Sequence, residues 1–244
     1  MIVLDSQGME GSLSPHKGNL SFLQKLYLRN NSFQGAIPHE LHLLSRLRIL
    51  NLGLNKFKGI IPVNISGCSN LVELDLSFNE LVGSISKEIG YLSKLTFLSL
   101  GYNNLTGGIQ SFLGNTTLME MFFVVENPLG GSIPIYNLSL LTNFSLQGNH
   151  LTGSLPLTID TMLPHLVFFQ LRTNQLTGPL PSSISKRSRL RHIEMTRNNF
   201  SGKLRIDFAK LREIIYINLS NNIFGSNETD EMNFIDSMKN CTRC

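Results

Sequence analysis

The stretch LNLGLNKFKGIIP, residues 50–62, recurs as LDLSFNELVGSIS at residues 74–86 and as LSLGYNNLTGGIQ at residues 98–110. In these units leucines lie five and three residues before an asparagine. That asparagine returns at intervals of 22 to 25 residues: Asn31, Asn55, Asn79, Asn103, Asn127, Asn149, Asn174, Asn198 and Asn222. Such a period indicates a solenoid, in which stacked neighbours bury what one unit cannot bury alone.

The chemistry of the unit predicts its structure. Alternating leucines place their side chains on one face of a short strand, and parallel pairing from unit to unit builds one long sheet. The asparagine amide has two donors and one acceptor, so we expect it to bond backbone groups of its own and the adjoining unit. The expected fold class is an α/β repeat solenoid. It should be a right-handed, curved superhelix with about nine parallel strands on its concave side, short 3-10 or helical turns on its convex side, and no second domain.

Composition excludes several functions. The formal charge of +4 is mild and no Lys/Arg-rich arm focuses it, so no nucleic-acid partner is expected. No apolar run approaches the ~20 residues that span a bilayer. The first residues also lack the pattern of a signal peptide, so we expect neither a leader nor a membrane segment in this chain. Motifs for catalysis, metals or cofactors are missing from the sequence, and we predict a non-enzyme without a metal or a cofactor.

Several motifs resemble a known family. Four segments are similar to the LxGxIP element of plant-type extracellular leucine-rich repeats: FQGAIP (33–38), FKGIIP (57–62), LTGSLP (151–156) and LTGPLP (176–181). Residues 11–23, GSLSPHKGNLSFL, and residues 224–242, FGSNETDEMNFIDSMKNCT, further resemble one receptor-kinase subfamily. That subfamily includes the plant receptors for bacterial flagellin and elongation factor and the rice bacterial-blight resistance receptor.

The resemblance implies a function as well as a curved leucine-rich-repeat superhelix. It implies the ligand-binding ectodomain of a plant receptor-like kinase in immune or developmental signalling, at the extracellular face of the plasma membrane. A peptide or protein ligand would bind the concave face and a co-receptor ectodomain would be a further partner, while the kinase domain of such receptors has no counterpart in these residues. A secreted inhibitor of microbial cell-wall-degrading enzymes is the alternative, because it would use the same face.

The repeat pattern divides the chain into three parts. Residues 1–22 form a degenerate first repeat without an N-terminal cap, residues 23–225 form repeats of about 24 residues, and residues 226–244 form an acidic spacer leading into a truncated repeat. Gln7 stands where the asparagine is expected, and Ser226 where the glycine is expected. Terminal units normally need caps, so we expect an internal fragment or truncated product with reduced independent stability.

Acceptor sequences for N-glycosylation are more frequent than the composition predicts, which favours a secreted glycoprotein. They begin at 11 positions: Asn19, Asn30, Asn64, Asn104, Asn115, Asn137, Asn143, Asn199, Asn218, Asn227 and Asn240. Asn143 and Asn218 fall at outward strand positions, where a sugar would block part of the concave face. Cys68 and Cys241 fall in the convex turn, where we expect buried thiols. A Cys241–Cys244 disulfide or half of a metal site is the alternative.

Two groups of charged residues could indicate a catalytic base or an anion-binding site. His192 and Glu194 share one strand face, as a general base and its partner would, but no nucleophile accompanies them and we expect solvated surface residues. The basic run KRSRLRH, residues 186–192, has the charge to bind phosphate or an acidic peptide. Most of it falls in the turn that enters a strand, so we expect a solvated edge.

The variable positions of LxxLxLxxN, the third, fifth, seventh and eighth, face the concave solvent. Large apolar residues concentrate there in the middle of the array, and exposed clusters rich in aromatic residues mark interaction sites. The alternative is that they are ordinary scattered surface residues. We predict that an extended peptide lies across the strands and that Arg172 suits a carboxylate. The predicted site comprises Phe78, Phe97, Tyr102, Met121, Phe123, Val125, Gln147, Phe168, Gln170 and Arg172.

Overall fold

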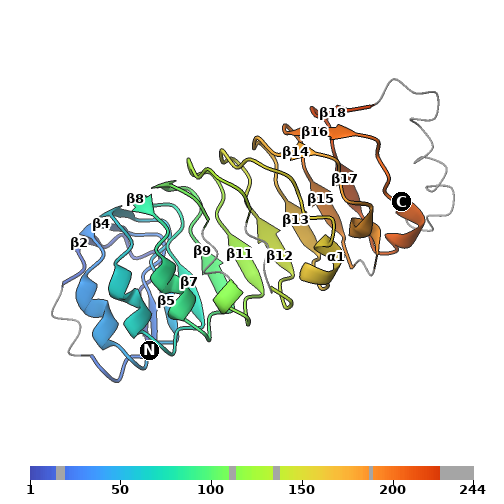
Figure 1. The fold of residues 1–244 in the computed structure, drawn as a ribbon. Helices are drawn as coiled ribbons and strands as arrows, with labels where there is room; N and C mark the ends of the chain where they lie inside the picture. Colours follow the sequence, from blue (N-terminus) through green and yellow to red (C-terminus); the bar gives the residue numbers. More distant parts are fainter. Residues whose placement is uncertain (15–19, 110–113, 134–137, 187–188, 226–244) are drawn as a thin grey trace.

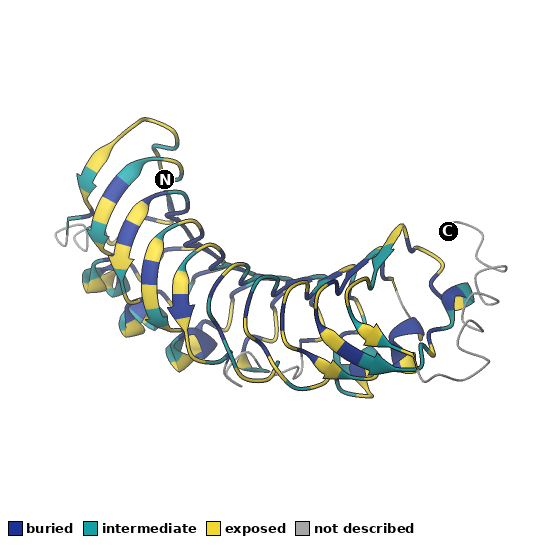
Figure 2. Ribbon diagram, turned by 90° about the horizontal axis from the view of Figure 1, so that it is seen from above, coloured by how far each residue is buried: buried dark blue, intermediate teal, exposed yellow. Residues whose placement is uncertain are grey.

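The computed structural model describes residues 1–14, 20–109, 114–133, 138–186 and 189–225. The units stack in chain order, and the array runs from the N-terminus at one end to the last repeats at the other (Figure 1). Seen from above, the array is curved, with short helical turns along its outer, convex side (Figure 2). The predicted curved solenoid is therefore confirmed.

A ten-stranded parallel sheet forms the concave side. From β3 to β15 the middle residue of each strand is buried in the core, whereas most flanking residues keep contact with solvent. The expected nine strands become ten because the degenerate first unit still contributes β1, which pairs with β3. The strands are β1 (Ile2–Val3), β3 (Lys25–Tyr27), β5 (Ile49–Asn51), β7 (Glu73–Asp75), β9 (Phe97–Ser99), β11 (Met121–Phe123), β12 (Asn143–Ser145), β13 (Phe168–Gln170), β15 (His192–Glu194) and β17 (Tyr216–Asn218).

Two smaller sheets lie beside it and were not predicted. A five-stranded sheet contains β2 (Glu10–Ser12), β4 (Ser32–Ala36), β6 (Lys56–Gly59), β8 (Glu80–Ser84) and β10 (Asn104–Thr106). A three-stranded sheet contains β14 (Thr177–Gly178), β16 (Asn199–Gly202) and β18 (Ile223–Phe224). The glycine four residues after each repeated asparagine has φ between 75° and 84° in eight units. Residues with side chains rarely adopt this conformation, which explains why the position is glycine.

The convex side consists of short turns, as predicted. The only α-helix among the described residues is the one-turn α1 (Ile159–Met162). In most units that carry a 3-10 turn, a proline or serine in extended conformation precedes it and sets the chain direction. The 3-10 turns are η2 (His39–Leu43), η3 (Val63–Gly67), η4 (Lys87–Tyr91), η6 (Ser182–Ser185) and η7 (Phe208–Lys210).

The repeated asparagines form the predicted ladder. At Asn55 the amide nitrogen donates to the carbonyl of Leu28 (2.9 Å) in the preceding unit and of Leu52 (3.0 Å) in its own unit. Its amide oxygen accepts from the N–H of Phe33 (3.0 Å). At all nine positions the amide both donates to and accepts from the preceding unit's backbone. The ladder therefore satisfies polar groups that a regular helix or sheet would otherwise pair.

Cys68 is buried in the convex turn, as predicted. Its thiol is free and donates to the carbonyl oxygen of Leu41 at 3.1 Å. Burial raises the pKa of this thiol to about 12. Cys241 and Cys244, the other two cysteines, lie outside the described residues.

Candidate functional site

Half of the predicted ligand-binding residues lie on the concave strands in the predicted register: Phe97, Met121, Phe123, Phe168 and Gln170. The other half follow the ends of these strands: Phe78, Tyr102, Val125, Gln147 and Arg172. Strands β9, β11, β12 and β13 place Phe97, Met121, Asn143 and Phe168 side by side in one row. At about 4.8 Å between neighbouring strands, this row spans about 15 Å. Phe123 lies two residues further along β11, in a second row that faces the same side. These residues therefore lie on the open face of the concave sheet, in rows that run across the strands.

The first cluster on this surface consists of two ring pairs, and we call it the N-terminal aromatic cluster. Phe97 and Phe123 lie diagonally across β9 and β11, with ring centroids 5.8 Å apart and planes inclined by 57°. Phe78 and Tyr102 stack face to face at 4.1 Å. They expose 40% and 46% of their surfaces, so folding does not account for these rings. Met121, opposite Phe97 on the neighbouring strand, is half-buried.

A left-handed backbone explains how the second pair reaches the surface. Phe78 and Tyr102 have φ of 54° and 56°, which is unusual for bulky residues. The residue directly before each of the nine ladder asparagines adopts this conformation. The turn is therefore a property of the unit, and the identity of the eighth residue is left free for surface chemistry.

Polar residues interrupt the predicted patch. Strand β12 carries the half-buried Asn143 and the buried Ser145, and Gln147 donates from its amide nitrogen to the Ser145 hydroxyl at 3.2 Å. Arg172 is exposed and forms no ion pair with another described residue. The structure therefore separates Phe168 from the N-terminal aromatic cluster, and the predicted site is not one continuous apolar surface.

Phe168 instead begins a second row, which sequence analysis missed and which we call the C-terminal aromatic row. The ring of Phe168 lies 6.0 Å from that of His192, and His192 stacks on Tyr216 at 4.4 Å. These residues occupy the third position of three consecutive units, on β13, β15 and β17. Reading the third position for ring side chains, histidine included, would have found the row.

The expectation that Glu194 is solvated is wrong. Its side chain lies beside this row and the residue is only 8% exposed. The carboxylate accepts from the N–H and hydroxyl of Thr196, from the Tyr216 hydroxyl at 3.0 Å and from the Asn218 amide at 3.4 Å. Burial alone raises the pKa of this carboxyl, but these hydrogen bonds outweigh it and hold the pKa below its usual 4.5. Glu194 is therefore ionised at neutral pH.

A second buried carboxylate, Asp75, occupies the same fifth position on β7, in the N-terminal half of the face. It accepts from the N–H (3.0 Å) and hydroxyl (2.6 Å) of Ser77 and pairs with the Arg29 guanidinium at 2.9 Å. Arg29 reaches across the intervening unit at Gly53. A Cβ there would lie 2.9 Å from Arg29 Nη1 and 3.1 Å from Asp75 Oδ1. The missing side chain of Gly53 thus permits an ion pair between residues two units apart.

The glycosylation sequons differ in accessibility. Asn30, Asn104, Asn115 and Asn199 are exposed, Asn64, Asn143 and Asn218 are half-buried, and Asn19, Asn137, Asn227 and Asn240 lie outside the described residues. Asn143 and Asn218 are on the concave strands β12 and β17, as predicted. The exposed amides are accessible to an attached sugar. Glycosylation at each sequon stays a prediction.

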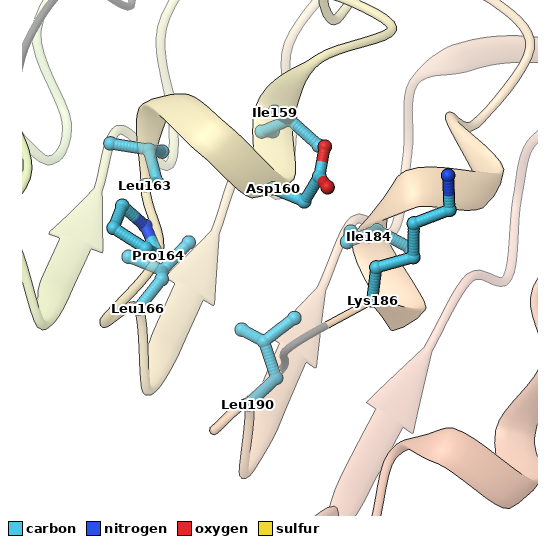
Figure 3. Close-up of a pocket in the computed structure, with 8 residues that line it drawn as sticks. All are labelled: Ile159, Asp160, Leu163, Pro164, Leu166, Ile184, Lys186 and Leu190. Carbon is cyan, nitrogen blue, oxygen red and sulfur yellow. The ribbon is translucent and has the colours of Figure 1, made fainter.

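Neither the described residues of the basic run, from which 187 and 188 are excluded, nor the convex cavity adds a further site. Arg191 pairs with Glu213 at 3.5 Å, and both side chains are about half exposed (50% and 48%), as expected of a solvated edge. A small cavity between α1 and η6 is lined mostly by apolar side chains, together with Asp160 and Lys186 (Figure 3). Its volume of about 20 Å³ suits a single water. Within the described residues, no helix is long and apolar enough to cross a membrane, and no His, Cys, Asp and Glu side chains gather as a metal site.

Comparisons with known proteins agree with this geometry. Two family models described as leucine-rich repeats match residues 21–81 and 94–116. A sequence comparison with curated proteins finds no match. Together with the parallel concave sheet and the asparagine ladder, these matches define the chain as a leucine-rich-repeat solenoid.

Solved structures of plant proteins extend the comparison. The plant peptide hormone receptor RGFR1 in complex with RGF2 is 25% identical, with a TM-score of 0.84 over 97% of this chain. The Arabidopsis receptor kinase HAESA, in complex with the peptide hormone IDA and the co-receptor SERK1, is 28% identical, with a TM-score of 0.83 over 89%. This chain spans 41% and 36% of those two chains. A plant ice-binding protein is 26% identical, with a TM-score of 0.78 over 93% of this chain and 73% of its own.

Proposed function

We propose that this chain is a ligand-binding part of a plant cell-surface receptor-kinase ectodomain and that its ligand is an extended peptide. The observation that carries the proposal is the N-terminal aromatic cluster. Its four rings lie on the concave face, two on strands and two in the turns that follow, where packing of the solenoid does not require them. Exposed apolar clusters of this kind mark interaction sites. The likeness to RGFR1 with RGF2 and to HAESA with IDA supports a peptide as the ligand.

The peptide lies across the strands. The row from β9 to β13 is about 15 Å long, which four or five extended residues at about 3.3 Å each would match. Phe97, Tyr102, Met121 and Phe123 act as apolar anchors. Further polar side chains on the same face supply selectivity: Gln147, Gln170 and Arg172. Arg172 suits a carboxylate because its guanidinium offers forked donors.

We also propose the setting that the resemblance implies. The receptor belongs to the subfamily of the flagellin, elongation-factor and rice bacterial-blight receptors, and it acts at the extracellular face of the plasma membrane in immune or developmental signalling. Residues 11–23 and 224–242 support this subfamily. A co-receptor ectodomain as second partner is supported by the likeness to HAESA, whose complex contains SERK1. The three-part division at residues 22 and 225 belongs to the same proposal, as do sugars on the sequons outside the path of the peptide; Asn143 and Asn218 stay unmodified when the peptide binds.

A secreted inhibitor of microbial cell-wall-degrading enzymes is the second candidate. The likeness to a plant ice-binding protein supports considering it, because the same fold serves a protein whose description names no receptor. The two functions differ in their partner. A receptor of peptides binds short synthetic peptides, whereas an enzyme inhibitor needs the folded surface of its enzyme.

Selection of a random peptide library on the secreted full-length protein tests the proposal. We expect enrichment of short peptides that contain apolar side chains and bind the wild-type protein but not the Phe97→Ala/Phe123→Ala variant. Phe22→Ala is the matched control, because Phe22 is 63% exposed and lies outside the concave strands. Enriched peptides that bind the double variant equally well would contradict the site. Inhibition of a pectin-degrading enzyme without peptide enrichment would favour the second candidate.

A further inference from the structure

Two carboxylates at the same position of the repeat unit differ in whether a cationic side chain balances their negative charge. Asp75 and Glu194 both lie at the fifth position, and both accept from the N–H and hydroxyl of the residue two further along. Asp75 also pairs with the Arg29 guanidinium at 2.9 Å. Glu194 receives its remaining hydrogen bonds from the neutral groups of Tyr216 and Asn218. Among the described residues, no lysine or arginine forms an ion pair with Glu194.

Within the described part of the chain, Glu194 therefore carries a negative charge at the concave face without an ion-pair partner. The residue is 8% exposed, so little water screens the charge, and its pKa keeps it ionised down to acidic pH. Arg172 and Arg197 stand in the neighbouring and the same unit, yet both are exposed and neither pairs with it. The bond from Asn218, at 3.4 Å, is the longest at the carboxylate and reaches the oxygen beside Tyr216. Each carboxylate oxygen thus accepts two hydrogen bonds, and a ligand donor replaces the long bond from Asn218.

The C-terminal aromatic row lies next to this charge. Phe168 is 38% and Tyr216 41% exposed, and Tyr216 connects the row to the carboxylate through its hydroxyl. Aromatic faces attract cations within about 6 Å of the ring centroid. A guanidinium combines the two contacts, because it stacks on rings and donates in a fixed plane to a carboxylate. The negative charge and the exposed rings thus favour the same chemical group.

We propose that Glu194, Phe168 and Tyr216 form a subsite for a cationic side chain, preferentially arginine, of the bound peptide. This inference rests on the proposed function and specifies the ligand further. Strands β11 and β15 are three steps apart in the sheet, which is about 14 Å. About four extended residues cover that distance. The ligand therefore carries a basic residue about four positions from its apolar anchor.

Designed peptides test the subsite directly. Each fluorescein-labelled peptide contains two phenylalanines, a Gly/Ser spacer of two to eight residues and one arginine, and a matched series carries citrulline, which is neutral and of the same shape. Dissociation constants are measured by fluorescence polarisation on the full-length secreted protein. We expect arginine to bind at least about tenfold more tightly than citrulline, with the largest preference at a spacer of about three residues. The preference should decline with added salt, because charges are screened.

Matched variants assign the effect to the subsite. Glu194→Gln should abolish the arginine preference, whereas Asp75→Asn, the same change at the compensated carboxylate, should retain it. Both variants also carry Ser220→Ala, which removes the sequon at Asn218 and so prevents a sugar beside Glu194. Phe168→Leu keeps an apolar side chain without the ring and should reduce the preference while circular dichroism stays unchanged.

The outcomes separate the two proposals. Equal binding of arginine and citrulline peptides, or a preference that survives Glu194→Gln, overturns the subsite and leaves peptide binding by the N-terminal aromatic cluster intact. Failure of every peptide of both series to bind overturns the subsite together with the proposed function. A preference that is lost in Glu194→Gln and kept in Asp75→Asn establishes the subsite.

Discussion

The asparagine ladder keeps the same residue in each of its units, whereas the concave strand face changes its residues from unit to unit. The ladder makes the same two bonds to the preceding unit at nine positions. A few residues upstream, the third and fifth positions of the strands change from charged to aromatic to polar and back to aromatic. The backbone N–H and C=O groups at this turn are the same in every unit. The residue that forms hydrogen bonds with them is therefore the same in every unit as well. The third and fifth positions do not bond these repeated backbone groups, so their side chains can differ from unit to unit and match a ligand.

The largest expected effect is the loss of stability when one asparagine of the ladder is replaced. Asn103→Ala should lower the free energy of unfolding by about 3 kcal/mol, because it leaves several backbone groups of core residues without a hydrogen-bond partner. Those groups are the N–H of Leu81 and the carbonyls of Leu76 and Leu100. Asn104→Ala, at the exposed neighbour, should change it by less than about 0.5 kcal/mol. Chemical denaturation measures both, and equal shifts would show that the ladder is not the structural column.

The next test removes anchors from the variable face. Phe97→Ala combined with Phe123→Ala should weaken binding of a selected peptide by about 2 kcal/mol or more, about thirtyfold. Both rings are half-buried at the surface, so we expect a smaller loss of stability than at a buried core position. Titration calorimetry on folded protein measures the affinity. Retained affinity in the double variant, with Phe22→Ala as control, would move the site off this cluster.

A third test measures whether an ion pair on the variable face contributes to the stability of the fold. Gly53→Ala places a methyl group against Arg29 and Asp75 and should destabilise by about 1 kcal/mol through loss of their ion pair. Gly108→Ala is the control, because its added Cβ would meet the backbone at an ordinary 3.6 Å. Thermal unfolding compares the two. A neutral Gly53→Ala would show that Arg29 adapts, and the face would then be variable throughout.

The smallest effect reports on the packing between units. The pKa of Cys68 is raised to about 12, so the folded protein carries almost no thiolate there at pH 8. We expect iodoacetamide to modify Cys68 far more slowly in folded than in urea-unfolded protein, because the thiolate is the reactive form. Mass spectrometry of the peptide that contains Cys68 measures the rate. Rapid labelling of folded protein would indicate that the stacked units open readily.

Much of the fold was predictable because it depends on local periodicity. The position of the asparagine determined the register, and the register placed Phe97 beside Met121 and Phe168 on the same surface. The lateral sheets were missed because the segment before the glycine is short and turn-like in sequence. Pairing with the neighbouring unit makes it a strand, and that pairing is a tertiary contact.

The sequence alone determined the solenoid, the ladder and the outward positions, because these follow from a period that repeats every 22 to 25 residues. Only the tertiary structure decided how the outward residues group. Arg29 reaches Asp75 because Gly53 leaves space between them, 46 residues apart. Glu194 has no such partner among the described residues, and hydrogen bonds from its neighbours keep it buried and charged. Side-chain reach and burial depend on three units at once, and no single repeat contains that information.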